Sequence, residues 1–170
     1  IFPKGAIVGA IFTQAGTAPN VVTDKATLRM TVRGATVSDL EDIILPAIKA
    51  AANCIATSYG ATVDMHHYEP LFKDMRQDER LVSLFDEVMT ELGESPRKLP
   101  PDEADGSTDV GNVSYEVPTA QPTLNIGNQL EAHTPEFACA AGSPYGLDQA
   151  IKGAKIMAVV ALRYAESLEV

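Results

Sequence analysis

Positive charge is scarce in this sequence of 170 residues. There are 13 lysines and arginines against 23 aspartates and glutamates, so the formal net charge is −10. Because phosphate binding needs a basic surface, we expect no nucleic-acid partner and no binding to anionic membranes. The sequence also has no long apolar run. Its best candidate, residues 156–162, is far shorter than the roughly 20 residues that a transmembrane helix needs.

Cysteine is almost absent. The two cysteines, Cys54 and Cys139, are far apart and belong to no Cys-x-x-Cys pattern, which excludes a disulfide framework or a zinc finger. Their small apolar neighbours predict buried free thiols. With no secretory signal peptide at the start, this composition predicts a cytoplasmic protein. The first residue is not Met and lies close to a predicted strand, so we expect a fragment of a longer polypeptide.

A complete active site is also missing. We find no Ser-His-Asp or Cys-His arrangement and no glycine-rich loop that would hold a phosphate. The carboxylates Asp102, Glu103 and Asp105 are interpreted as a solvated acidic loop and not as a pair that bridges two metals. Nothing in the chain alone therefore predicts an independent catalyst.

The N-terminal part of the chain has the pattern of strands around one helix. Residues 5–13 are apolar and predict a buried strand, and residues 24–33 alternate with period two, as a half-buried strand does. Residues 61–68 predict another strand. The resulting β-β-α-β order would be a ferredoxin-like unit if one more β-α preceded it.

The helix between these strands has recognisable start and stop signals. Ser38 and Glu41 have the spacing of a capping box, and apolar residues then recur at helical spacing. Pro46 lies inside that pattern and predicts a kink. Gly60 is a good C-terminal stop.

A second region begins near Pro70. Residues 81–92 predict an amphipathic helix that ends at Gly93, and residues 94–106 predict a loop. Two short strands are predicted around residues 112–117 and 121–127. The last predicted helix covers residues 146–168. Its stretch 154–162 is apolar nearly all round, so it should be buried.

Histidine is limited to three residues. His66 and His67 are adjacent in a predicted strand, so they point to opposite faces and cannot hold one ion together. His133 lies in a small-residue loop close to Pro135. A stiff loop with an accessible imidazole suits a zinc ligand. The alternative is a solvated histidine without a ligand.

Two other places could bind a ligand. Residues 105–112 concentrate small polar groups, among them Ser107, Thr108 and Asp109. This loop could present hydroxyl and N–H groups to a ligand, or it could be an Asx-type turn. Arg33 ends a predicted strand, where it could clamp a carboxylate. It could equally pair with Asp39 or Asp42 at the surface.

Four segments, in this order, resemble M20-type metallopeptidases and amidohydrolases, and most closely the branch with aminobenzoyl-glutamate hydrolases. Residues 16–26 (GTAPNVVTDKA) resemble the lid-domain motif, and residues 28–33 (LRMTVR) resemble the strand after it. Residues 106–114 (GSTDVGNVS) are similar to the small-residue loop of the catalytic domain. Residues 132–137 (AHTPEF) are similar to the late segment that supplies the last metal ligand.

The resemblance implies an α/β fold whose lid is α+β. Residues 1–70 would be a ferredoxin-like lid and dimerisation domain without its first β-α, and residues 71–170 the C-terminal part of a zinc-peptidase-like catalytic domain. His133 would be a metal ligand. The family's lid asparagine and arginine contact substrate, so Asn20 and Arg33 inherit that role. Residues 107–109 (Ser-Thr-Asp) would line or brace the site.

The implied parent protein hydrolyses amide bonds in N-acyl amino acids or dipeptides. In the family two divalent metals, usually zinc with manganese or cobalt as alternatives, lower the pKa of a bridging water, and a glutamate moves the proton. Most of that machinery belongs to a half that this chain does not contain, so the isolated chain should be inactive. The resemblance also implies a homodimer through the lid. The alternative is a non-catalytic ferredoxin-like dimerisation or regulatory module.

Overall fold

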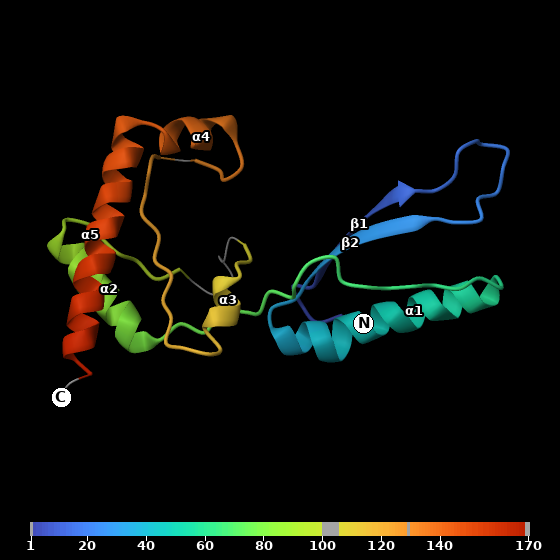
Figure 1. The fold of residues 1–170 in the computed structure, drawn as a ribbon, viewed down its shortest axis with the longest axis horizontal. Coiled ribbons are helices and arrows are strands. Elements are labelled where there is room, and N and C mark those ends of the chain that lie inside the picture. Colours follow the sequence, from blue (N-terminus) through green and yellow to red (C-terminus); the bar gives the residue numbers. More distant parts are fainter. Residues whose placement is uncertain (1, 100–105, 129, 169–170) are drawn as a thin grey trace. The chain divides into compact units, whose positions relative to one another are not determined.

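The computed structural model describes residues 2–99, 106–128 and 130–168. It combines helices with one small antiparallel sheet (Figure 1), which confirms the mixed helix-and-sheet class predicted from the sequence. The chain divides into two compact units, Ile1–Asp74 and Met75–Val170. We call them unit 1 and unit 2 and describe each by itself. The assignment of residues 1–70 to a lid and of 71–170 to a catalytic domain stays a prediction.

Unit 1 begins with an antiparallel hairpin. β1 (Ile7–Gln14) pairs with β2 (Thr27–Arg33), so that Ile7 lies opposite Arg33 and Phe12 opposite Leu28. The register shifts between Phe12 and Gln14, where the Thr13 hydroxyl donates to the Thr27 carbonyl at 3.3 Å. Both strands were predicted, because β-branched and aromatic residues favour the pleated conformation.

The burial predicted for the first strand is wrong. Every residue of β1 is exposed, including Ile11 at 64% and Phe12 at 68%. In β2, Met30 and Val32 are half-buried between exposed neighbours, as the alternation predicts. The residues of β1 point to both faces of the two-stranded sheet, and no described element covers them on either face.

The helical segment after the hairpin starts with a wide turn. A π-helical turn, η1 (Asp39–Ile44), leads directly into α1 (Leu45–Ser58). Pro46 lies one residue inside α1, so the irregularity predicted at the proline takes the form of a π turn just before it. The capping box is wrong. Ser38 is itself helical and caps nothing, and the Thr36 hydroxyl accepts from the Asp39 N–H at 3.1 Å.

The predicted helix end is confirmed. Gly60 has a φ of +67°, a left-handed conformation that glycine adopts without strain. Its N–H donates to Thr57 O, and the next N–H, of Ala61, reaches back to Ala56 O. These two bonds form a Schellman cap, which satisfies carbonyls that the helix leaves free.

The core of unit 1 is small. Leu40 and Ile44 are its buried apolar residues, and they pack on Gly34, where an added Cβ would lie 3.2 Å from each side chain. α1 has no fully buried residue, although its apolar pattern predicted a buried face. That pattern lacks a partner surface large enough to cover it.

The strand predicted at residues 61–68 is wrong. These residues form an irregular segment that returns alongside the hairpin and α1 (Figure 1). The Arg29 guanidinium lies 4.9 Å from the ring centre of Tyr68, and the Val37 N–H donates to Asp74 Oδ1 at 2.8 Å. The segment is thus held by side-chain contacts and not by a backbone ladder.

Unit 2 is built on two helices, α2 (Glu79–Glu91) and α5 (Pro144–Glu166), with the shorter α3 (Val110–Val113) and α4 (Pro135–Ala141). The two long helices were predicted to within a few residues. Asp78 caps α2 by accepting from the Leu81 N–H at 2.9 Å, and Gly93 ends it with a φ of +84°. Their apolar faces meet in one cluster, which consists of Val88, Met89, Ile156 and Val160.

Three predictions for unit 2 are wrong. Residues 112–117 begin in α3 and continue as turns, and residues 121–127 form an irregular segment between α3 and α4 (Figure 1). The stretch 154–162 of α5 is buried on one side only, since Met157 is 59% and Leu162 67% exposed. α2 is the long helix that packs on α5, so one face stays uncovered.

Both cysteines are free thiols, as predicted, but Cys54 on α1 and Cys139 on α4 are exposed. The predicted burial of the two thiols is therefore wrong. None of the helices among the described residues combines the length and apolar character needed to span a bilayer.

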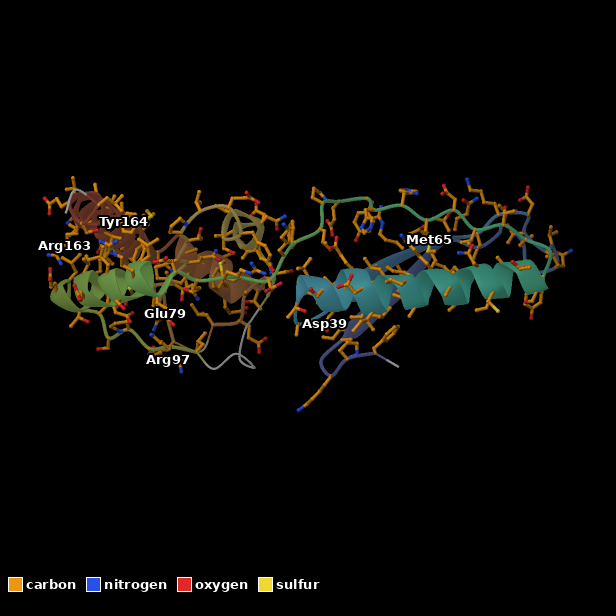
Figure 2. The ribbon with its side chains drawn as sticks, turned by 90° about the horizontal axis from the view of Figure 1, so that it is seen from below. Asp39, Met65, Glu79, Arg97, Arg163 and Tyr164 are labelled. Carbon is orange, nitrogen blue, oxygen red and sulfur yellow. The ribbon has the colours of Figure 1, made fainter. Side chains whose placement is uncertain are left out.

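A two-pronged ion pair joins the long helices of unit 2. Arg163 on α5, which is labelled in Figure 2, donates to both carboxylate oxygens of Glu91 on α2, at 2.9 and 2.7 Å. These hydrogen bonds lower the pKa of Glu91 below its ordinary value of 4.5. They also raise the pKa of Arg163.

This pair predicts a pH-dependent contribution to stability. A carboxylate with a lowered folded-state pKa stabilises the fold above its unfolded pKa, and that stability is lost as the pH falls through the folded pKa. Glu91→Gln should therefore lower the thermal midpoint slightly at pH 7, and the deficit should shrink as the pH falls below about 4.5 and disappear below the lowered folded-state pKa. Melting curves between pH 3 and 7 measure it. Glu87→Gln, an exposed neighbour without this hydrogen bond, is the control. Equal pH dependence of both variants would contradict the assignment.

Candidate functional site

The predicted substrate residues of unit 1 lie at the two ends of its hairpin. Asn20 lies in the exposed connection between β1 and β2, inside a turn that is closed by the hydrogen bond from the Val21 N–H to Ala18 O at 3.3 Å. Arg33 is the last residue of β2 and is exposed. Within the described ranges it forms no ion pair, so the pairing with Asp39 or Asp42 is not seen. Both side chains are open to solvent.

The small polar loop of unit 2 leads into α3. The Thr108 hydroxyl accepts from the Val110 N–H at 3.3 Å, and its carbonyl accepts from the Gly111 N–H at 3.2 Å. These bonds make a local turn of the Ser/Thr type. Ser107 and Asp109 are exposed beside it. The acidic residues Asp102, Glu103 and Asp105 lie outside the described residues.

His133 lies just before α4. Its φ is +66°, and it is the non-glycine residue with a left-handed backbone among those the structure describes. The next residue, Thr134, caps α4 by accepting from the Phe137 N–H at 3.2 Å, and its hydroxyl donates to Glu131 O at 2.7 Å. The ring is exposed. The backbone on its C-terminal side is therefore fixed, while the imidazole stays free to bind.

The other two histidines lie on the surface of unit 1. His66 Nδ1 is 3.9 Å from Asp64 Oδ2, and both side chains are largely exposed. His67 is exposed as well. Because the segment is not a strand, the argument from opposite faces does not apply, but an exposed pair of this kind fits the surface role that was predicted.

The described residues do not assemble a metal site by themselves. No group of three or more His, Cys, Asp or Glu side chains in residues 2–99, 106–128 and 130–168 is arranged to hold an ion. Within unit 2, α3 and α4, which follow the polar loop and His133, lie apart from each other (Figure 1). His133 is thus a single candidate metal ligand, and no described group of His, Cys, Asp or Glu side chains completes a site around it.

Sequence reasoning missed a cluster around Arg76. Its guanidinium lies 3.6 Å from the ring centre of Tyr115, and its backbone N–H donates to the Ser114 hydroxyl at 2.9 Å. With Asp78 and Glu116 these residues line an open hollow of about 330 Å³. The stacking of Arg76 on Tyr115 is a cation–π contact. Because the two residues are far apart in the sequence, only the three-dimensional structure shows this contact.

Sequence reasoning also missed a pocket of about 490 Å³ in unit 2. Its wall is apolar except for Gln121 at the exposed rim and Gln149 on α5, which is only 5% exposed. A signal existed: Gln149 has the helical spacing of the buried residues Ile156 and Val160, so it lies on the inward face of α5.

Comparison with known proteins relates the chain to peptidases at low identity. No family model matches it. The chain is 28% identical to the Xaa-Arg dipeptidase of Mus musculus over an alignment of 163 residues, which covers 91% of this chain and 36% of that protein. It is 42% identical to the Xaa-Arg dipeptidase of Homo sapiens over 57 residues, 34% of this chain and 13% of that protein.

The chain thus spans about a third of the length of the mouse dipeptidase that it matches. The similarity is therefore to one part of a dipeptidase, and at low identity.

Proposed function

We propose that this chain is the C-terminal part of an M20-type metal-dependent hydrolase that cleaves amide bonds in dipeptides or N-acyl amino acids. The observation that carries the proposal is the similarity to a dipeptidase along 91% of the chain. Dipeptides that end in arginine are the first substrates to test, because the similar proteins are Xaa-Arg dipeptidases. A net charge of −10 would also attract a cationic substrate.

In this proposal His133 is a metal ligand. Three features support the role: an exposed imidazole, a backbone fixed by the Thr134 cap, and a left-handed conformation that most residues avoid. Two divalent ions, zinc or alternatively manganese or cobalt, would need further ligands from polypeptide outside this chain. The described residues alone do not form the metal site.

Asn20 and Arg33 are proposed to hold the substrate. Both side chains are exposed, and Arg33 has no ionic partner in the described part of the chain. Its guanidinium could therefore take a substrate carboxylate in a two-pronged pair. Ser107, Thr108 and Asp109 are proposed to line or brace the site, since two of them are exposed and Thr108 fixes their turn.

The proposal includes a cytoplasmic homodimer that forms through unit 1. The exposed apolar side chains of β1, with Ile11 on one face and Phe12 on the other, support self-association. The non-catalytic module stays the alternative, because the same strand would serve a dimerisation domain without any activity. The two proposals differ in whether the native protein turns over an amide.

The test compares the native gene product with the isolated 170-residue chain. The native product should hydrolyse alanyl-arginine, lose activity on chelation and regain it with zinc, manganese or cobalt. The isolated chain should show no turnover even with added zinc, because one candidate ligand does not hold a catalytic ion. Amino-acid release measures both. Metal-dependent turnover by the isolated chain would refute the fragment assignment. An inactive but dimeric native product would favour the module.

A further inference from the structure

We propose that Ser95 is a phosphorylation site for a proline-directed protein kinase, and that its phosphate weakens the ion pair between Glu94 and Lys152, which joins the end of α2 to α5. Three observations support this inference: the residues that follow Ser95, the conformation of residues 94–99, and the state of the other hydroxyls that precede a proline. The inference goes beyond the proposed hydrolase activity and does not depend on it.

The residues that follow Ser95 match what such a kinase recognises. Pro96 comes directly after the hydroxyl, and Lys98 lies three positions after it. Kinases of this class require a proline next to the target residue and prefer a basic residue at the third position. Proline has no N–H, so it suits a kinase site that offers no acceptor there. The ammonium group of Lys98 can pair with an anionic group of the kinase.

The conformation of residues 94–99 makes Ser95 accessible. They form an irregular segment after α2, in which Ser95, Lys98 and Arg97, which is labelled in Figure 2, are exposed. Within the described residues, no backbone N–H or C=O group of residues 95–99 is hydrogen-bonded. The segment can therefore enter a kinase cleft as an extended chain without breaking a helix or a strand.

The structure distinguishes Ser95 from the two other hydroxyl residues that precede a proline, Thr134 and Ser143. Both of those are N-caps. Their hydroxyl oxygens accept from the N–H groups of Phe137 and Gly146, at 3.2 and 3.1 Å. A phosphate on either oxygen would remove a helix cap. The Ser95 hydroxyl has no hydrogen-bond partner among the described residues, so its modification costs no such bond.

The modification is a phosphoryl transfer from ATP. The Ser95 Oγ attacks the γ-phosphorus, the bond from that phosphorus to the bridging oxygen of the β-phosphate breaks, and ADP leaves. The hydroxyl proton passes to the catalytic aspartate of the kinase. The product carries roughly 1.5 to 2 negative charges at neutral pH.

The new charge lies directly beside the ion pair of Glu94 with Lys152. The two side chains are partly buried, at 21% and 31% exposure. A phosphate next to a carboxylate repels it and competes for the same ammonium group. The phosphate also lies just beyond the C-terminal end of α2, where the helix dipole disfavours negative charge. Phosphorylation should therefore loosen the end of α2 from α5.

The first test incubates the full 170-residue chain with a purified cyclin-dependent kinase and Mg-ATP. We expect incorporation of about one phosphate per chain, located at Ser95 by peptide mass spectrometry. Ser95→Ala should abolish it, and Pro96→Ala should slow it at least about tenfold. Absence of incorporation would overturn the inference. Modification of Thr134 or Ser143 at a comparable rate would overturn it too, since the caps would then give no protection.

The second test compares the thermal midpoints of the phosphorylated and unmodified chains at low salt. Phosphorylation should lower the midpoint by about 2–4 °C. In Glu94→Gln, which removes the ion pair, most of this shift should disappear. In Glu87→Gln, an exposed residue of α2, the shift should remain. An unchanged midpoint, or an equal shift in both variants, would overturn the proposed effect on the ion pair.

Discussion

Ile156→Ala is expected to destabilise unit 2 by about 2–5 kcal/mol, the usual cost of truncating a fully buried isoleucine. Ile156 is 2% exposed and belongs to a cluster of four buried residues that holds α2 against α5. Because the cluster has only these four buried residues, few side chains can shift to fill the cavity that the truncation leaves. Because whole domains are stable by only about 5–15 kcal/mol, the loss should be visible as partial unfolding.

Hydrogen exchange of peptides from α2 and α5 measures this effect separately from unit 1. Met157→Ala is the matched control: the adjacent residue is 59% exposed, so its truncation should cost less than about 1 kcal/mol. If both variants lost protection equally, the face of α5 assigned to the core would be wrong.

In the native gene product, His133→Gly is expected to remove one metal equivalent and most of the activity without destabilising the fold. Glycine suits the φ of +66° at this position better than any L-residue, whose left-handed conformation costs about 1–2 kcal/mol. Loss of the imidazole is then separated from damage to the backbone. Metal content by mass spectrometry, turnover and thermal midpoint are the three readouts.

His67→Gly serves as the control for His133→Gly. His67 is an exposed histidine of unit 1, and its replacement should change neither metal content nor activity. Unchanged metal stoichiometry in His133→Gly would contradict the ligand role. Loss of metal together with a large fall in thermal midpoint would indicate a structural role instead.

The helices could be predicted from the sequence because their signals are local. Gly60 and Gly93 end their helices with positive φ values, and the apolar spacing of α2 places Val88 and Met89 in the core. Such signals need only neighbours in the chain. The start of the first helix failed at Ser38 because Thr36, two residues earlier, supplies the capping oxygen.

Strands and burial were predicted less well because both depend on distant partners. Residues 61–68 and 121–127 have strand-like composition, yet no described strand pairs with them. Strand preference largely reflects packing against neighbours. The same reason explains the exposure of β1, of Cys54 and of the outer face of α5.

The candidate site was predictable only in part. Sequence similarity to a family singled out His133, and the structure adds its unusual backbone and its place before the cap of α4. Gln149 was overlooked, although its spacing on α5 indicates an inward position, because a glutamine in an apolar helix face is not by itself a motif. The stacking of Arg76 on Tyr115 joins residues far apart in sequence and left no local signal.

The exposure of β1 along its whole length affects how the protein behaves in solution. Residues Ile7–Gln14 (IVGAIFTQ) contain no charge and no proline, which is the composition of segments that assemble into amyloid-like fibrils. At neutral pH the surplus of negative charge keeps molecules apart. Near the isoelectric point of about 4.6 that repulsion disappears, so acidic buffers should turn dilute solutions into fibrous precipitate long before the helices of unit 2 melt.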